Sequence, residues 1–165
     1  MVATIRWVTS EDRALLDHFL RLAVFVPQGE PEPDDSIVTE PGLRAYVEDF
    51  GRRAGDRGVI ATRNGDTVGA AWARVFPDGT EVYGRLDDQT PVLAMAVEAG
   101  SRGNGIGTLM LRSLMSQLAD DGYECLSLSV QSDNSVAVAL YTSHGFEVVD
   151  QSDGELVMVT ALTGR

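Results

Sequence analysis

A glycine-rich stretch at residues 91–108 constrains the fold of this 165-residue chain more than any other feature. An apolar run at residues 92–97 predicts a buried strand, and three glycines follow it at alternate positions, Gly103, Gly105 and Gly107. A segment with helical periodicity comes next. The free N–H groups and the dipole at the start of a helix both favour an anion, so this order of elements predicts a phosphate-binding site.

Two common phosphate-binding signatures do not fit this stretch. The dinucleotide fingerprint G-x-G-x-x-G would need its third glycine at Thr108 or at Met110. The nucleotide P-loop needs a lysine before Ser or Thr, and the chain contains no lysine. What remains is the pattern R-x-x-G-x-G at residues 102–107, directly after a strand. For this loop taken alone, a glycine-rich turn without any ligand is the alternative.

The net charge of −12 argues against nucleic acid and against acidic membranes as partners, because no basic stripe exists to neutralise phosphates. It is compatible with a cationic small substrate, although a diffuse acidic surface is the simpler interpretation. No apolar run is long enough to span a bilayer, and Arg6 brings charge too early for a signal peptide.

The length predicts one domain, with residues 3–163 as its extent. Cys125 is the single cysteine and cannot form an internal disulfide, which fits a reducing cytoplasm. Because it falls in an apolar strand, we expect a buried structural thiol rather than a nucleophile.

Hydrophobic periodicity predicts strands and helices along the whole chain. Helices are expected after an N-cap at Ser10, over residues 42–52 and 106–119, and after Asn134. Asn64-Gly65 predicts a tight hairpin turn between two strands. The buried stripe of the helix after the glycines is expected to contain Ile106, Leu109, Met110, Leu114 and Leu118. The strands are expected at residues 4–8, 58–63, 67–76, 92–97, 125–130, 147–150 and 155–162.

Residues 27–41 predict a long loop rich in proline and acid. Its five carboxylates are Glu30, Glu32, Asp34, Asp35 and Glu40. Such loops are often lids or binding segments, and a solvated connection is the simpler alternative. His18, on the flank of the first helix, is expected to be a partner-satisfied histidine rather than a catalytic one.

A second informative stretch follows at residues 133–146. Asn134 can cap a short helix, which carries Ala139 and Leu140-Tyr141, and Gly145-Phe146 opens the next strand. Together with the R-x-x-G-x-G loop, and in this order, these residues resemble the GCN5-related N-acetyltransferases, the GNAT superfamily. The resemblance is clear over residues 91–149 and architectural before them.

The resemblance implies an α/β fold: a GNAT-like mixed sheet of six or seven strands, with splayed central parallel strands and about four helices. It implies acetyl-CoA as the acyl donor, and no metal. The backbone of Met95, Ala96 and Val97 would pair with the pantetheine amides, and Asn134 would orient the cofactor or merely cap its helix. The pyrophosphate would be held by the amides of Arg102, Gly103, Asn104, Gly105, Ile106, Gly107 and Thr108.

The activity implied by the resemblance is N-acyl transfer, with direct attack of an acceptor amine on the thioester. Tyr141 matches the family position for the proton donor to the leaving thiolate. The acceptor would be a small-molecule or peptide amine. In this family the segment that joins the first two helices commonly borders the acceptor site, so the acidic loop would favour a cationic acceptor; a homodimer is left open. A non-catalytic acyl-CoA sensor of the same fold is the alternative. The general base is not assigned among the candidates Glu81, Tyr83, Asp87, Asp88 and Glu98.

Overall fold

The computed structural model describes residues 2–24, 26, 29–31 and 33–162. The expected domain limit at residue 163, the start of the acidic loop at Pro27, and Glu32 within it lie outside these residues. The elements, in which η marks a 3-10 turn, are β1 Thr4–Trp7, η1 Ser10–Asp12, α1 Arg13–Ala23, η2 Asp35–Thr39, α2 Pro41–Arg44, β2 Arg57–Arg63, β3 Asp66–Arg74, β4 Val92–Val97, η3 Ala99–Ser101, α3 Ile106–Asp120, β5 Cys125–Gln131, α4 Ser135–Ser143, β6 Glu147–Ser152 and β7 Glu155–Ala161.

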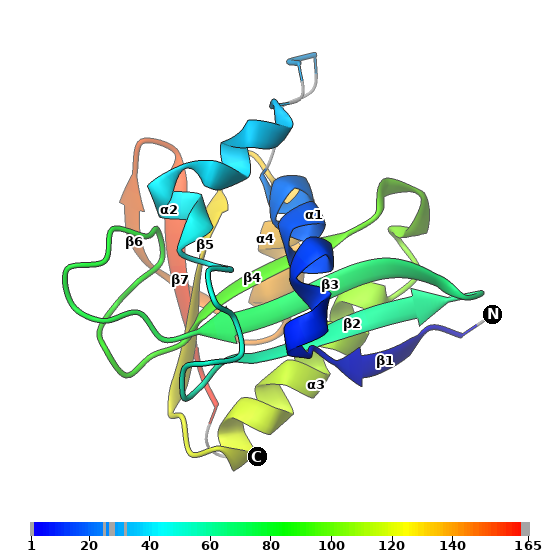
Figure 1. Ribbon diagram of the computed structural model, residues 1–165. Helices are drawn as coiled ribbons and strands as arrows, with labels where there is room; N and C mark the ends of the chain where they lie inside the picture. Colours follow the sequence, from blue (N-terminus) through cyan, green and yellow to red (C-terminus); the bar gives the residue numbers. More distant parts are fainter. Residues whose placement is uncertain (1, 25, 27–28, 32, 163–165) are drawn as a thin grey trace.

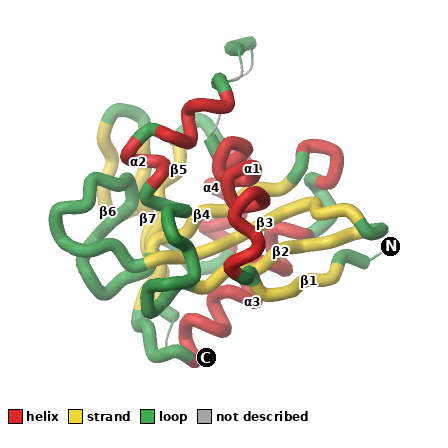
Figure 2. The backbone as a smooth tube through the Cα atoms, viewed as in Figure 1, coloured by secondary structure: helices red, strands yellow, loops and turns green. Residues whose placement is uncertain are grey.

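A single seven-stranded mixed sheet organises the chain, in the order β1-β2-β3-β4-β5-β7-β6. Neighbouring strands are antiparallel except for β4 and β5, which run parallel at the centre. Helix α1 crosses one face of the sheet, while α3 and α4 pack on the opposite face (Figures 1 and 2). The expected mixed sheet with central parallel strands and four helices is therefore confirmed.

The two faces of the sheet bury separate apolar clusters. Along β4 the side chains alternate, with Val92 and Ala96 packed on the α1 side and Leu93 on the α3 side. The cluster on the α1 side contains Leu16, Phe19 and Trp72. The cluster on the α3 side includes Ile106, Met110, Leu111, Leu114, Leu118, Leu126, Leu128 and Tyr141. Both faces of the central strands are thus covered, as their near-continuous apolar sequence requires.

Two local predictions, the first hairpin turn and the N-cap before the first helix, have different outcomes. Asn64 and Gly65 adopt φ of 56° and 84°, as a two-residue hairpin turn demands, so that prediction is confirmed. The predicted N-cap at Ser10 is wrong by one residue. Thr9 caps the turn, its hydroxyl accepting from Glu11 N at 3.3 Å, while the Asp12 carboxylate accepts from Thr9 N at 2.8 Å. This reciprocal capping box needs its acid three residues after the cap, a spacing that only Thr9 and Asp12 provide.

The predicted helix over residues 42–52 is much shorter in the structure. α2 ends at Arg44, and hydrogen-bonded turns continue to residue 51, with Asp49 at a left-handed φ of 53°. The physical cause is Arg74, which is fully buried and donates from Nη1 to the carbonyls of Ala45 and Glu48. These carbonyls would otherwise accept the bonds of a continuing helix.

α3 is the helix predicted after the glycines, but its buried stripe differs at one position. Leu111 is fully buried, whereas Leu109 is 37% exposed. At about 100° per residue, Leu111 lies only about 20° from Leu118 at one edge of the stripe, whereas Leu109 lies about 60° beyond Ile106 at the other edge. No helix in the described part of the chain is long and apolar enough to cross a membrane.

β5 departs from a simple alternation of buried and exposed residues. Ser127 is buried together with Leu126 and Leu128, and its hydroxyl donates to the Gly84 carbonyl at 2.7 Å. The segment that joins β3 to β4 therefore lies directly against β5. Cys125, expected to be buried, is only partly so, because it is the first residue of the strand.

Candidate functional site

The parallel pair β4–β5 opens at the centre of the sheet. The strands are paired at Val92 and Ser127, where Ser127 N donates to the Pro91 carbonyl at 3.0 Å. No further register pair between them is found among the described residues. Beyond this point the edge of β4 that faces β5 is not used by the sheet, which leaves main-chain groups available to a ligand.

The ladder with β3 decides which residues of β4 can present those groups. Glu98 N donates to the Val68 carbonyl at 2.8 Å. Because an antiparallel ladder alternates, Ala96 directs its N–H and C=O toward Ala70 of β3, while Met95 and Val97 direct theirs toward the gap. Of the three residues expected to bind the cofactor by main chain, Ala96 is therefore not available for that role.

The glycine loop presents a run of unpaired amides. Gly103 and Gly105 adopt φ of 82° and 78°, and a Cβ at either position would meet open space. The first bond of α3 runs from Leu109 N to the Gly105 carbonyl at 3.0 Å. Within the described residues, no acceptor is found for the N–H groups of residues 103–108. Left-handed glycines are required here because L side chains rarely adopt this backbone conformation.

The polar side chains of the loop hold its own backbone in place. Arg102 Nε donates to the Val97 carbonyl at 3.1 Å, which ties the loop to the end of β4. Asn104 Nδ2 donates to the carbonyls of Ser101 at 3.1 Å and Arg102 at 3.3 Å. Both side chains therefore satisfy carbonyls, and the N–H groups of the loop are left for an anion.

Three elements converge beside these amides. A Cβ on Gly107 would lie 3.4 Å from Leu140 Cδ2 and 3.7 Å from Met95 Cε. The start of α3, the middle of α4 and the gap-facing edge of β4 therefore meet at one place. Two sequence motifs more than 30 residues apart along the chain are thus brought together.

Tyr141 occupies this region from α4. It is buried, and its ring contacts Phe146 edge-on with centroids 5.6 Å apart. No hydrogen-bond partner for its hydroxyl is found in the part of the chain that the structure describes. Burial raises the pKa of Tyr141 to about 12. The phenol therefore keeps its proton at neutral pH and is free to donate it.

Comparison with known proteins identifies this arrangement. Residues 18–146 match the Acetyltransferase (GNAT) family, a span that includes the gap, the glycine loop and Tyr141. The chain belongs to the GNAT family. A mycothiol acetyltransferase of Sanguibacter keddieii is 30% identical over 125 residues, covering 76% of this chain and 38% of that protein. The chain thus spans well under half the length of this relative.

Solved GNAT structures share the fold over nearly the whole chain. An acetyltransferase of the GNAT family from Streptococcus pneumoniae superposes with a TM-score of 0.72 at 21% identity, covering 97% of this chain and 99% of that one. PaiA N-acetyltransferase from Thermoplasma acidophilum, determined in complex with coenzyme A, gives 0.72 at 15% identity, covering 98% and 99%. At these identities the likeness shows the shared architecture.

Asn134 acts as a helix cap in this GNAT domain. Its Oδ1 accepts from Ala137 N at 3.3 Å, as the sequence predicts for an N-cap. Gly145 ends α4 in a left-handed conformation with φ of 92°, also as expected. A cap contact occupies one lone pair of the amide oxygen, and the role of Asn134 toward the cofactor stays a prediction.

The candidates for the general base are scattered. Glu98 Oε2 lies 2.8 Å from His18 Nε2, so the histidine is partner-satisfied as expected and the carboxylate is already engaged. The pKa of Asp87 is lowered, chiefly by the Gln89 amide and then by the Thr90 hydroxyl, which makes it a poor base. Tyr83 is 68% exposed, and Glu81 and Asp88 are exposed as well. No base is assigned from this set.

The acidic loop contributes structure as well as charge. Asp34 caps η2 by accepting from Ser36 N at 3.2 Å. Asp35, 90% exposed, forms an ion pair with Arg21 at 3.2 Å. Glu30 and Glu40 are exposed. Two of the five carboxylates thus have local structural roles, which weakens the case for the loop as the determinant of a cationic acceptor.

Two further residues near β5, Tyr46 and Glu155, were not identified from the sequence. Tyr46 follows α2, and its hydroxyl donates to the Tyr83 carbonyl at 2.7 Å. Glu155 begins β7, where Gln131 Nε2 donates to its Oε1 at 2.8 Å. Its Oε2 is buried without a partner among the described residues. Glu155 lies beside Gln131 only because β5 pairs with β7, and no local sequence pattern predicts the register of that pair.

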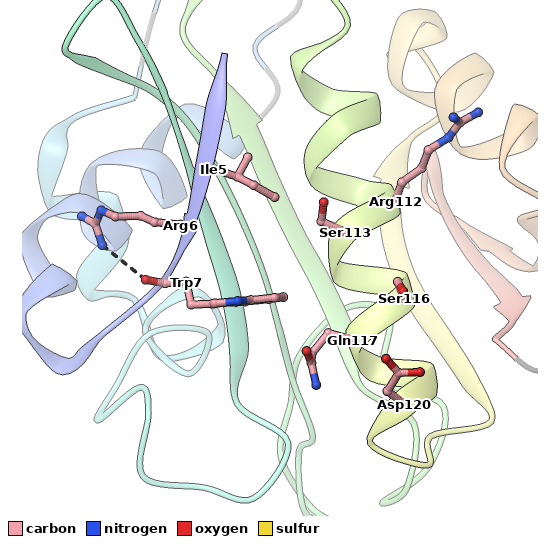
Figure 3. A pocket seen from close by; sticks show the side chains of 8 residues that line it. All are labelled: Ile5, Arg6, Trp7, Arg112, Ser113, Ser116, Gln117 and Asp120. Carbon is pink, nitrogen blue, oxygen red and sulfur yellow. Dashed lines mark hydrogen bonds between the residues drawn. The ribbon is translucent and has the colours of Figure 1, made fainter. Parts of the chain in front are cut away.

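A surface pocket lies away from these groups. It has a volume of about 450 Å³ and lies between β1 and the outer side of α3. Figure 3 shows its wall formed by Ile5 and Trp7 on one side and by Ser113, Ser116 and Gln117 on the other. None of the residues discussed for the glycine loop or the gap lines it.

Proposed function

We propose that this protein is an acetyl-CoA-dependent N-acetyltransferase that acts on a primary amine. The observation that carries the proposal is the set of unpaired N–H groups of residues 103–108 beside the open edge of β4. Family membership and the coenzyme A bound in the related PaiA structure support the same ligand. Acetyl-CoA supplies an activated acyl thioester, and the protein supplies its placement.

The residues present fit coenzyme A. Six consecutive amides at the start of α3 can hold the pyrophosphate, since the dipole of the helix adds to their donors. The N–H groups of Met95 and Val97 can pair with the amide carbonyls of the pantetheine chain, as in β-strand addition. The Val97 carbonyl already accepts from Arg102, so the strand edge offers donors more readily than acceptors.

Tyr141 acts as the proton donor in this proposal. Its hydroxyl has no partner within the described chain, and its raised pKa of about 12 keeps it protonated. A neutral phenol at this place can give a proton to sulfur as the thioester bond breaks. The acceptor nitrogen must lose two protons in passing from ammonium to amide. One balances the proton delivered to sulfur, and the other leaves to a base or to solvent.

The competing proposal is a domain that binds acyl-CoA without turnover. The Tyr141 hydroxyl favours the enzyme, because no hydrogen bond within the described chain commits it to a structural role. The acceptor is a small-molecule or peptide amine. The relative from Sanguibacter keddieii is a mycothiol acetyltransferase.

The test is calorimetric titration with acetyl-CoA, followed by a colorimetric assay of released thiol with a panel of primary amines. We expect micromolar binding of acetyl-CoA, no binding of ATP or NAD, and thiol release that depends on one class of amine. Binding without thiol release from any amine would favour the sensor. Failure to bind acetyl-CoA or free coenzyme A would overturn both proposals.

A further inference from the structure

The strand pair β5–β7 carries a polar cluster on the face that α3 and α4 leave uncovered. We name it the Glu155 cluster, and its members are Tyr46, Ser129, Gln131 and Glu155. Cross-strand pairs share a face, and Gln131 pairs with Glu155 in the ladder, as their side-chain hydrogen bond confirms. Leu128 and Val130 alternate to the other face, where they join the core under α3.

The carboxylate of Glu155 is only half satisfied. Oε1 accepts from Gln131 Nε2 at 2.8 Å, while Oε2 is buried with no donor among the described residues. Burial raises the pKa of Glu155, and the Gln131 hydrogen bond offsets part of that rise. A buried acceptor without a donor is costly, and native proteins usually pair such atoms with a ligand or water.

Tyr46 adds a second oxygen to the cluster. Burial raises the pKa of Tyr46, the negative charge of Glu155 raises it further, and the Ser129 hydroxyl lowers it. The Tyr83 carbonyl that accepts from this phenol adjoins Gly84, where a Cβ would lie 2.8 Å from Ser129 N, so Tyr46 lies beside β5 at the level of Ser129. Since its proton is donated to the Tyr83 carbonyl at 2.7 Å, its oxygen can interact with a further polar group only as an acceptor.

The cluster lies on the side from which an acceptor can approach. α3 and α4 occupy the other face, and Tyr141 and the glycine loop belong to them. On the near face, a Cβ on Gly84 would lie 2.8 Å from the backbone of Leu128 and Ser129, so the segment around Gly84 packs directly on β5 at this level. Figure 1 shows α2 above the same ends of β5 and β7.

The chemistry of the cluster selects a nitrogen cation. Its oxygens are acceptors, and one carboxylate provides negative charge. The described residues contain no group of three His, Cys, Asp or Glu side chains that could hold a metal ion. An alkylammonium presents several N–H donors and one positive charge. It can therefore donate to both the unpaired carboxylate oxygen and the phenol oxygen, and it balances the negative charge.

We propose that Glu155, oriented by Gln131 and assisted by Tyr46, is the residue that binds the cationic amine of the acceptor. This assignment rests on the proposed acetyltransferase function and adds the residue that selects its second substrate. It moves the recognition of charge from the exposed acidic loop to β7, where a half-buried carboxylate is screened less by salt.

The test follows the side-chain amide resonance of Gln131 by ¹⁵N NMR, because this group touches Glu155 directly. The probe is 1,4-diaminobutane, and the matched control is 1,4-butanediol, which has the same carbon chain and no charge. We expect a saturable shift with the diamine only. The variant Glu155→Gln should weaken the diamine affinity at least about tenfold. Glu147→Gln, which removes an exposed charge from the neighbouring strand β6, should leave it unchanged.

Two results would overturn the proposal. One is a wild-type Gln131 resonance that shows no saturable shift up to about 100 mM diamine, where a site with a Kd near 1 mM would be full. The other is an equal affinity in Glu155→Gln. Acetyl-CoA titration of the same samples separates this failure from a failure of the acetyltransferase proposal, because coenzyme A binding does not involve Glu155. The contrast between diamine and diol in the wild type does not depend on any variant folding.

Discussion

Arg74 in β3 and Tyr141 in α4 are both buried polar side chains, but they differ in how their donors are used. Arg74 makes four hydrogen bonds, two to the Asp56 carboxylate and two to main-chain carbonyls after α2, and lies against the Phe50 ring. The Tyr141 hydroxyl has no partner within the described chain.

The same contrast separates two regions of the molecule. Around Arg74 and around Asp12, buried charges are paired and hold segments together. At the start of α3, at Tyr141 and at Glu155 Oε2, polar groups lack partners within the described residues. Glu155 Oε2 is buried and the amides of the glycine loop are exposed, but neither is used by the described part of the fold, so both remain available to a ligand.

Loss of the most fully paired side chain should have the largest effect. Arg74→Met leaves the Asp56 carboxylate buried without its cation, so we expect about 3–5 kcal/mol less stability. Denaturant unfolding measures the loss. The matched control is Arg57→Met, whose ion pair with Asp121 is more exposed and should be worth less than about 1 kcal/mol. Similar losses in the two variants would remove the distinction between a paired interior and an ordinary surface ion pair.

The unpaired amides at α3 should respond to added charge. At Gly105 a side chain would extend into open space, so Gly105→Glu places a carboxylate where phosphate is expected and should weaken acetyl-CoA binding more than about a hundredfold. Gly79→Glu is the control, because Gly79 has a similar φ of 88°, also faces open space, and lies in the turn after β3. Calorimetry on both variants decides, and equal affinities would contradict the pyrophosphate site.

The unpaired hydroxyl of Tyr141 should matter to the reaction and little to the fold. We expect Tyr141→Phe to lower kcat by about ten- to a hundredfold with acetyl-CoA affinity retained. Its unfolding free energy should change by less than about 1 kcal/mol, since no hydrogen bond is lost. With a pKa of about 12, wild-type Tyr141 should cause no alkaline loss of kcat below about pH 11. An unchanged kcat with every accepted amine would remove Tyr141 from the proposed chemistry.

Features set by local chemistry were predictable from the sequence. Alternate glycines after an apolar run indicated the left-handed turn before α3, and Asn64-Gly65 indicated the hairpin, because left-handed backbone at those positions needs these residue types. Asn134 and Gly145 marked the ends of α4 for the same reason. In each case the residues that decide the structure are neighbours in the sequence.

Features set by tertiary contacts were not predictable in this way. The helix after Pro41 stops early because Arg74, thirty residues further along, takes its carbonyls. The main-chain groups of Ala96 are not available to a ligand because they pair with β3. Glu155 meets Gln131 only because β7 inserts between β5 and β6. The sequence shows that these residues are present, but the contacts between them depend on strand register and packing, which no local pattern predicts.

The paired carboxylate of Asp12 offers the mildest test of the comparison. Its hydrogen bonds from Arg6, together with those from Thr9, lower the pKa of Asp12 to about 2, below its ordinary value of about 3.9. A carboxylate with a lowered pKa stabilises the fold fully above its unfolded value, and this stabilisation is lost as the pH falls toward 2. Because Arg6 is half exposed, we expect about 1–2 kcal/mol.

The measurement is the difference in unfolding free energy between the wild type and Asp12→Asn. It should be largest at pH 5 and shrink steadily toward pH 2. Asp17→Asn is the control, since its ion pair with Arg13 at 3.4 Å is more exposed and should give less than half this change. A difference that stays constant with pH would mean that Asp12 acts through its cap geometry alone. The ion pair between Asp12 and Arg6 would then add nothing to the free energy of unfolding.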